Sequence, residues 1–378
     1  MSIEQNPIIL SVKLEPPASL ACRCFRLSWP SGRPNLQICM ISVQPVPEPF
    51  KFIRRQVIKF LKIMAAGGLF LWLAAMPTRA NDAVLEGKSN WLFAGWESLS
   101  AAKPEGERQS IKLIAETASQ LAAKNIRLVV VVVPLKPRYY ESLLPDGSAM
   151  SDLVRRRYDR LVTELRTAGV SSPDVRDAFK SVIADKKEVF YRTDFHWTTF
   201  AAEATADLVA GMVTAEGPLP GKRGSGAQLG EWINDRHLGD LAANFLAPER
   251  KRAIGPEAYV IRTAVKSAAG LLDADPSPVA VVGNSFVQPY FGFPQRLSNR
   301  IDRPVALKWN PGDVGPWATL LQYLQSAEFA GNPIKCLVWQ FNEAQIQNGP
   351  DAVGEWAASS ISSADAWRSR MTEAIKNR

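Results

Sequence analysis

The chain has 378 residues, of which 46% are hydrophobic and 22% are charged, and this composition predicts a folded protein of one large or two ordinary domains. Its net charge of +8 comes from the front, because residues 1–80 hold ten basic and three acidic residues and leave 35 basic against 34 acidic residues for the rest. A nucleic-acid-binding protein would concentrate basic residues on its folded part, so we expect no nucleic-acid partner.

The first 80 residues have the pattern of an extension followed by an export signal. Residues 1–50 contain eight prolines and no sustained apolar periodicity, which predicts disorder. Residues 51–62 contain five basic residues, and this basic segment precedes the apolar run 63–76. Thr78 and Ala80 then supply the small residues that a signal peptidase reads, so we expect export to the periplasm.

The apolar run leaves open whether the exported protein is soluble or anchored. Its 14 residues are fewer than the roughly 20 that span a bilayer, which favours cleavage after Ala80. Phe60 and Leu61 could instead lengthen the run into an inner-membrane anchor through residues 60–76. Because export signals normally begin a protein, we also expect the true start of the chain near Met40.

Beyond residue 80 the pattern alternates between helix and strand. Residues 126–133 are apolar on both faces, which is typical of a strand in the middle of a parallel sheet. Residues 217–230 contain five glycines and two prolines, which predicts a long surface loop. The alternation predicts an α/β fold with a doubly wound, mostly parallel sheet flanked by helices. Further strands are predicted at 188–192, 278–282, 305–309 and 334–341, and helices at 107–124, 150–168, 198–213, 317–329 and 352–375.

The chain contains only two histidines, His196 and His237, so an imidazole that moves protons near neutral pH must be one of them. His196 follows Asp194 by two residues, between a predicted strand and a predicted helix, where side chains can project into a cleft. Asp194 could accept a hydrogen bond from one imidazole nitrogen, or it could cap the following helix. His196 could instead be a structural residue, and His237 is the alternative base. Two histidines with scattered carboxylates are a poor supply of metal ligands, so we expect no metal and no other cofactor.

Ser285 lies at the carboxyl end of a predicted buried strand, directly after Gly283 and Asn284. A serine at this place can act as a nucleophile, or it can simply cap the next helix. Together with His196 and Asp194 it completes the Ser-His-Asp arrangement of acyl transfer, so we predict these three as the catalytic residues.

An acyl intermediate also needs hydrogen-bond donors for its oxyanion. The backbone N–H of Ser285 or of Phe286 is one predicted donor, and the side chain of Asn284 is another. Tryptophan and tyrosine rings can stack on sugars, although each can equally belong to the core. The predicted substrate contacts near the strand ends are Trp197, Asn284, Arg138 and Tyr139.

Several of these blocks carry a family resemblance. The Gly-Asn-Ser-Phe of residues 283–286 and the Asp-Phe-His-Trp of residues 194–197 resemble the serine and Asp-x-His blocks of the SGNH-hydrolase-like acetyltransferases that modify exopolysaccharides, the alginate O-acetyltransferase AlgJ/AlgX group. Residues 87–93, 133–136 and 239–241 match further blocks in the family's order. The chain ends soon after its last predicted strand, which leaves no room for an appended carbohydrate-binding domain, so the AlgJ branch is the more similar one.

The resemblance implies an organisation and an activity. It implies an SGNH-like acetyltransferase domain over residues 81–345, followed by a C-terminal helix within 346–378. An acetyl group would pass to Ser285, with His196 acting first as base and then as acid, and a hydroxyl of an alginate-like exopolysaccharide would accept it. The family's members work with a membrane-bound O-acyltransferase that supplies acetyl groups across the inner membrane, so such a partner is expected.

Two other functions stay open at this point. A carbohydrate esterase of the same fold would release acetate, because water and sugar compete for the same acyl-enzyme. A non-catalytic polysaccharide-binding scaffold would use the cleft without any acyl transfer. The residues alone do not decide between these functions and the transferase.

Overall fold

The computed structural model describes residues 23–26, 37–40, 83–265 and 275–378. The chain divides into two units, Met1–Pro77 and Thr78–Arg378. In the first unit, β1 (Arg23–Arg26) pairs antiparallel with β2 (Gln37–Met40). The disorder of residues 1–50 stays a prediction.

The predicted export segment, residues 51–80, lies outside the described residues. Among the described helices, none is long and apolar enough to cross a membrane.

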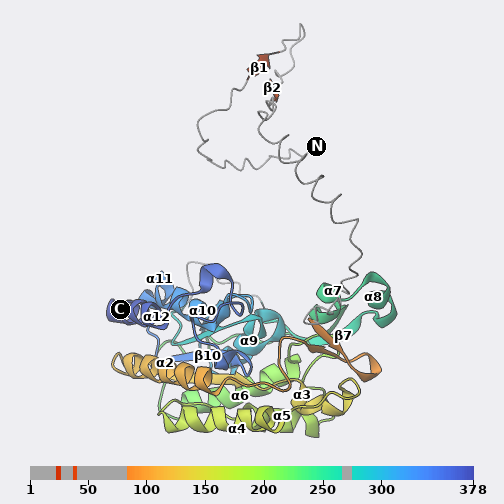
Figure 1. The fold of residues 1–378 in the computed structure, drawn as a ribbon. Helices are drawn as coiled ribbons and strands as arrows, with labels where there is room; N and C mark the ends of the chain where they lie inside the picture. Colours follow the sequence, from red (N-terminus) through yellow and green to blue (C-terminus); the bar gives the residue numbers. More distant parts are fainter. Residues whose placement is uncertain (1–22, 27–36, 41–82, 266–274) are drawn as a thin grey trace, which may run out of the picture. The chain divides into compact units, whose positions relative to one another are not determined.

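The centre of the second unit is a four-stranded parallel sheet in the order β5–β10–β8–β9 (Figure 1). This arrangement confirms the predicted parallel α/β sheet. All four strands were predicted within a few residues of their ends, because each is a short apolar run of Val, Leu, Ile or aromatic residues. Their bounds are Arg127–Val133 for β5, Val279–Gly283 for β8, Val305–Trp309 for β9 and Cys336–Asn342 for β10.

The position predicted for β5 is wrong, because β5 forms an edge of this ladder. Beyond it, a single parallel bridge joins Val129 to Ser171, and the Val130 N–H donates to the Ser171 carbonyl at 2.8 Å. β5 is nevertheless buried along its length, because helices cover both of its faces. A continuous apolar run therefore indicates that both faces of a strand are buried. It does not indicate whether the strand lies at the edge or in the middle of the sheet.

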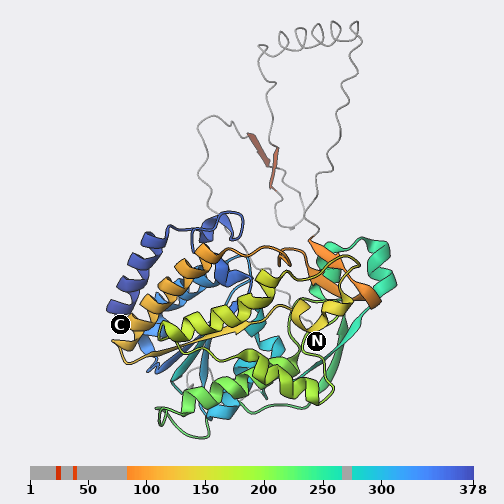
Figure 2. The ribbon, with the colours of Figure 1, turned by 60° about the horizontal axis from the view of Figure 1, so that its bottom comes forward.

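Successive residues of β5 face two different helical layers, as the alternation of side chains along a strand requires. Leu128 and Val130 pack in the core cluster of α2, α4, α10 and α12, whereas Val129 and Val131 pack in that of α5, α6 and α9. Figure 2 shows α2 beside α12 on the first side. The helices of the two layers are α2 (Pro104–Ala122), α4 (Asp152–Thr167), α5 (Val175–Ala184), α6 (Thr199–Thr214), α9 (Phe293–Ile301), α10 (Gly315–Leu324) and α12 (Ala364–Lys376).

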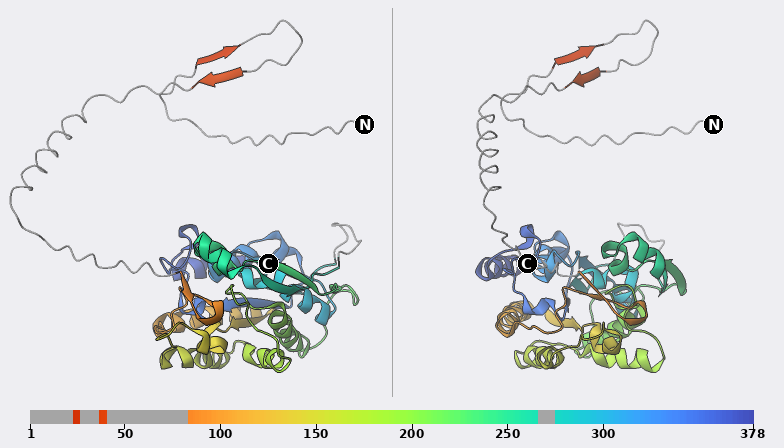
Figure 3. Two further views of the ribbon diagram at one scale, coloured as in Figure 1. Left: turned by 90° about the vertical axis from the view of Figure 1, so that its right-hand side faces the viewer. Right: turned by 45° about the vertical axis from the view of Figure 1, so that its right-hand side comes forward.

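A small lobe, which the sequence did not predict, lies at the end of the sheet that carries the site (Figures 1 and 3). It contains two antiparallel ribbons and two short helices, and Leu241 of α7 packs on Leu92 and Ala94 of β4. The bounds of these elements are β3 Val84–Glu86, β4 Leu92–Ala94, β6 Ile233–His237, β7 Glu257–Ile261, α7 Asp240–Phe245 and α8 Pro248–Ile254.

Two predicted helices are shorter than their apolar patterns indicated. The helix predicted at 317–329 is divided into α10 and α11 (Ala327–Gly331), because the Ser326 hydroxyl accepts a hydrogen bond from the Phe329 N–H and starts a new helix. The helix predicted at 352–375 begins only at Ala364, where Ser363 is the N-cap. Serine caps therefore set both helix starts.

Glu343, directly after β10, is the centre of a buried ion-pair network. Its carboxylate is fully buried and accepts hydrogen bonds from Arg157 Nε at 3.0 Å, from Arg138 Nε at 2.6 Å and from the Leu135 N–H at 3.0 Å. The network joins the ends of β5 and β10 to α4.

We expect Glu343→Ala to lower the free energy of unfolding by about 3–5 kcal/mol, because it leaves Arg157 buried without its partner. The matched control is Glu116→Ala, which breaks a half-exposed pair with Arg368 at 2.6 Å and should cost less than about 1 kcal/mol. Urea unfolding of both variants measures the difference. Equal costs for the two variants would contradict the structural role of Glu343.

Candidate active site

Asp194 and His196 lie on a loop that closes on itself before α6. The strand predicted at 188–192 is absent, since the segment makes only one bridge, between Phe190 and Trp197. The Tyr191 N–H donates to the His196 carbonyl at 3.2 Å, which holds the two arms of the loop together. The helix begins as predicted, with the Thr198 hydroxyl accepting from the Ala201 N–H at 3.3 Å. The loop is therefore fixed at its base by backbone hydrogen bonds and by a capped helix.

The three predicted catalytic residues form one continuous chain of hydrogen bonds. His196 Nδ1 lies 2.7 Å from Asp194 Oδ1, and His196 Nε2 lies 2.7 Å from Ser285 Oγ. Asp194 and His196 are buried, and Ser285 begins a 3-10 helix directly after β8. With a proton on Nδ1, the imidazole donates to Asp194 and accepts from the Ser285 hydroxyl, which is the arrangement that activates a serine nucleophile.

The second oxygen of Asp194 is also fully engaged. Asp194 Oδ2 accepts hydrogen bonds from the Tyr259 hydroxyl at 2.9 Å and from the Asp240 N–H at 3.2 Å. Burial opposes the ionisation of Asp194, but the charge of His196 and the hydrogen bonds from His196 and Asp240 outweigh it and hold the pKa of Asp194 below its ordinary value. Asp194 therefore stays ionised beside the imidazole.

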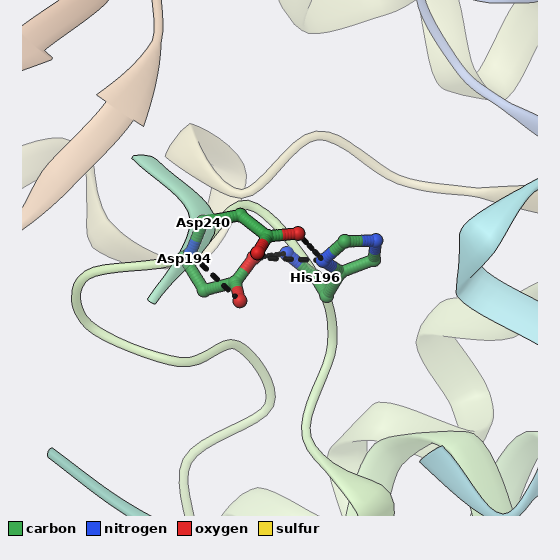
Figure 4. Close-up of side chains that lie close together, drawn as sticks. All are labelled: Asp194, His196 and Asp240. Atoms are coloured by element: carbon green, nitrogen blue, oxygen red, sulfur yellow. Dashed lines mark hydrogen bonds and ion pairs between the residues drawn. The ribbon is translucent and has the colours of Figure 1, made fainter. Parts of the chain in front are cut away.

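A second carboxylate faces the same imidazole nitrogen, as Figure 4 shows. Asp240 Oδ2 lies 3.5 Å from His196 Nδ1, and burial together with the charge of Asp194 raises the pKa of Asp240. The three residues offer ligand atoms within 4.8 Å of one another, so they could hold a metal ion. A metal on either imidazole nitrogen would displace the contact with Asp194 or with Ser285, so the absence of a metal stays our prediction.

A family model described as "SGNH hydrolase-like domain, acetyltransferase AlgX" matches residues 84–343. The chain belongs to this family. The resemblance inferred from the sequence motifs is thereby confirmed, and the protein is an acetyltransferase of the SGNH hydrolase-like type.

Named relatives agree with this assignment. The probable alginate O-acetylase AlgJ of Pseudomonas putida is 31% identical over 299 residues, which cover 74% of this chain and 75% of that protein. The corresponding protein of Pseudomonas fluorescens is 28% identical over 290 residues, covering 74% and 73%. The solved O-acetyltransferase domain of P. putida AlgJ has a TM-score of 0.63 at 26% identity and covers 77% of this chain and 98% of that domain. AlgX of Pseudomonas aeruginosa, at 22% identity and a TM-score of 0.53, shares the fold.

Lys136 fixes the loop that carries Asp194 and His196, a role that the sequence did not predict. It is almost fully buried, and its Nζ donates to the carbonyls of Leu92 at 2.6 Å, Arg192 at 2.9 Å and Asp194 at 2.8 Å. Burial lowers the pKa of Lys136 to about 7, against the raising effect of nearby carboxylates. A lysine three residues after a largely buried strand was the signal that could have identified it.

Gly239 lets the start of α7 approach the catalytic loop closely. A Cβ at this position would lie 2.5 Å from the Thr193 carbonyl and 2.7 Å from the Asp194 nitrogen. Because of this approach, the Gly239 N–H reaches the Thr193 hydroxyl at 3.1 Å and the Asp240 N–H reaches Asp194. The Gly-Asp-Leu block thus holds the loop that carries Asp194.

We expect Gly239→Ala to lower the rate of ester cleavage by at least about tenfold, because the added methyl group pushes α7 away from Asp194 and removes one of its hydrogen bonds. The control is Gly211→Ala in α6, where a Cβ meets nothing within 4 Å and helix propensity improves. The measurement is the rate of aryl acetate cleavage by each of the two variants. An unaffected rate in Gly239→Ala would show that the loop does not depend on this contact.

The structure distinguishes between the two predicted backbone donors of the oxyanion hole. The Phe286 N–H is already bonded to Asn284 Oδ1 at 3.0 Å, whereas no described residue accepts from the Ser285 N–H. Asn284 Nδ2 gives one hydrogen to Gln345 Oε1 at 2.9 Å, and an amide nitrogen has two. The Ser285 N–H and the second Asn284 hydrogen are therefore the donors that remain for an oxyanion.

A cavity of about 630 Å³ opens beside Ser285 and Asn284. Aromatic side chains that the sequence analysis did not select form much of its wall, and flat aromatic faces suit the stacking of sugar rings. These residues are Trp96, Phe195, Phe245, Trp309 and Trp356.

Three predicted substrate contacts lie elsewhere, so those predictions are corrected. Trp197 is fully buried and its Nε1 donates to the Phe286 carbonyl at 2.8 Å, so it has no surface to offer a sugar. Arg138 is bound to Glu343, and Tyr139 packs on Phe179, with ring centroids 5.3 Å apart. Arg138 and Tyr139 come after β5 and Trp197 adjoins His196, but all three side chains turn into the protein.

His237, the alternative base, makes no contact with Ser285. Its Nδ1 lies 2.9 Å from the Leu238 carbonyl, and its Nε2 lies 2.9 Å from the Tyr290 hydroxyl. Its ring stacks on Tyr259 at 3.9 Å between centroids. Because Tyr259 donates to Asp194, His237 supports the site through Tyr259.

Proposed function

We propose that this acetyltransferase transfers acetyl groups to hydroxyls of an exopolysaccharide through an acetyl ester on Ser285. The observation that carries the proposal is the hydrogen-bonded chain from Asp194 through His196 to Ser285, which ends at an aromatic-walled cavity. The AlgJ relatives are named for O-acetylation of alginate, so an alginate-like polysaccharide is the acceptor we propose.

The first half of the reaction acylates the serine. Ser285 Oγ attacks the carbonyl carbon of the acetyl donor while its proton moves to His196 Nε2. The ionised Asp194 stabilises the imidazolium that forms, and the Ser285 N–H and the Asn284 side chain bind the oxyanion. The bond to the leaving group then breaks, and the leaving group takes the proton from His196.

The second half returns the enzyme to its starting state. A sugar hydroxyl oxygen attacks the acetyl carbonyl carbon while its proton moves to His196 Nε2. The bond between that carbon and Ser285 Oγ breaks, and Ser285 Oγ receives the proton. If water attacks in place of the sugar, the same steps give an esterase.

We further propose a periplasmic location and a membrane-bound O-acyltransferase partner that supplies the acetyl groups. The support for export is the basic and apolar pattern of residues 51–80, with an anchor through 60–76 as the alternative to cleavage. The proposed division of the chain is an extension at 1–50, the export segment, the acetyltransferase domain at 81–345 and the C-terminal part at 346–378.

The test is to incubate the purified protein with 4-nitrophenyl acetate, with and without unacetylated alginate oligosaccharides, and to follow both products by mass spectrometry. Acetylated oligosaccharide is the expected result. Free acetate alone, in amounts that the oligosaccharide does not change, would favour the carbohydrate esterase. No cleavage of the ester and binding of the oligosaccharide would favour the non-catalytic scaffold.

A further inference from the structure

One buried glutamate in the wall of the active-site cavity has no side-chain partner among the described residues. Glu97 lies three residues after β4, where its N–H donates to the Ala94 carbonyl at 3.2 Å. The residue is 6% exposed, and no described residue forms a hydrogen bond or an ion pair with its carboxyl oxygens. Its carboxyl oxygens are not among the fully enclosed unbonded atoms of the described residues, so they are open to the cavity, where a ligand can supply the missing hydrogen bond.

Glu97 faces the same cavity as Ser285, together with its neighbour Trp96. Trp96 is 46% exposed, and its ring makes an edge contact with Phe195 at 5.4 Å between centroids. An exposed aromatic face next to a buried carboxyl can bind a sugar in two ways at once, by stacking on the ring and by accepting hydrogen bonds from hydroxyls. Both residues can therefore contact a sugar that is bound in this cavity.

From this geometry we infer that Glu97 binds the acceptor sugar, its carboxylate accepting a hydrogen bond from a sugar hydroxyl and so directing the acceptor to the acetyl group on Ser285. The inference rests on the proposed function. Glu97 takes no part in bond making. It raises the share of acyl-enzyme that reacts with sugar and lowers the share that reacts with water.

The charged groups around Glu97 make this contact depend on pH. Burial and the charge of Glu343 raise the pKa of Glu97 to about 7, although Arg157 and Lys136 lower it. Asp240 and Glu355 lie in the same cavity wall. Below about pH 7 the carboxyl is protonated, and above it the carboxylate accepts a charge-assisted hydrogen bond, which is the stronger kind. Acceptor binding should therefore improve as the pH rises through about 7.

The ratio of transfer to hydrolysis isolates this effect, because both reactions need the same Ser285, His196 and Asp194. We measure the ratio with 4-nitrophenyl acetate and a subsaturating amount of unacetylated alginate oligosaccharides, between about pH 6 and pH 8. In the unaltered protein the ratio should rise with pH. In Glu97→Gln it should fall about tenfold at the high end and lose its pH dependence, as expected for the loss of one charged hydrogen bond.

Two further variants complete the test. Glu97→Asp keeps the charge but withdraws it by one methylene group, so the ratio should fall while its pH dependence remains. Glu231→Gln makes the same change at an exposed glutamate that does not line this cavity, and it should leave both the ratio and its pH dependence as they were.

A ratio in Glu97→Gln that matches the unaltered protein at every pH would overturn the inference, as would an equal fall in Glu231→Gln, which would indicate a general charge effect. Failure of the unaltered protein to acetylate any oligosaccharide, with ester cleavage intact, would overturn the proposed function itself. The two failures are therefore distinguishable.

Discussion

Ser285→Ala is expected to abolish acetyl transfer and ester cleavage, with a loss on the order of 10⁵–10⁶-fold in turnover. The hydroxyl that His196 Nε2 contacts at 2.7 Å is the group that would carry the acetyl ester, and no other described hydroxyl is bonded to that imidazole. Turnover of an aryl acetate and formation of acetylated oligosaccharide both report the loss.

The matched control is Ser181→Ala in α5, whose hydroxyl donates to the Ala178 carbonyl of its own helix at 2.7 Å and to no other described residue. This variant should keep its activity within about twofold, since surface substitutions of this kind change stability by only a few tenths of a kcal/mol. Activity that survives Ser285→Ala to the same extent would exclude the proposed nucleophile.

Asp194→Asn is expected to slow both reactions on the order of 10³–10⁴-fold, by analogy with the same change in other Ser-His-Asp enzymes. The amide cannot stabilise the imidazolium that forms on His196, and it can present an N–H in place of the acceptor that fixes the imidazole tautomer. The loss should appear in turnover, because Asp194 is buried behind His196.

Asp240→Asn separates the two carboxylates that face His196. Asp240 is 3.5 Å from the imidazole with its side chain 49% exposed, so its replacement should cost less than about tenfold. The reverse order of the two losses would mean that Asp240, and not Asp194, orients the imidazole. Circular dichroism of both variants confirms that the comparison is made between folded proteins.

The structure brings Asp194, His196 and Ser285 together, as the sequence led us to expect, because chemistry and chain position agree there. Two histidines in the whole chain left few choices of base, and a serine at the end of a buried strand was the natural nucleophile for His196. The order of the motifs along the chain indicated the family, and the family model confirms that assignment. These signals are local, so they could be read without knowing how the elements pack.

The sequence did not predict contacts that depend on packing between distant elements. Trp197 adjoins His196 along the chain, yet α9 and the segment after Ser285 enclose its ring, which lies 5.7 Å from Phe286 and from Phe293. Glu97 lines the active-site cavity and Lys136 donates to the Asp194 carbonyl, although both residues are far from the Asp-x-His block in the sequence. A side chain's direction is set by its three-dimensional neighbours, and the pattern of residues around it does not report them.

The acyl-enzyme itself is the most direct test of the account. The purified protein is mixed briefly with an acetyl ester in the absence of acceptor, quenched in acid, and digested for peptide mass mapping. We expect the added mass of one acetyl group on the peptide that contains Ser285, and its disappearance when oligosaccharide is added before quenching. An acetyl group on another residue, or none at all while the ester is still consumed, would contradict transfer through Ser285.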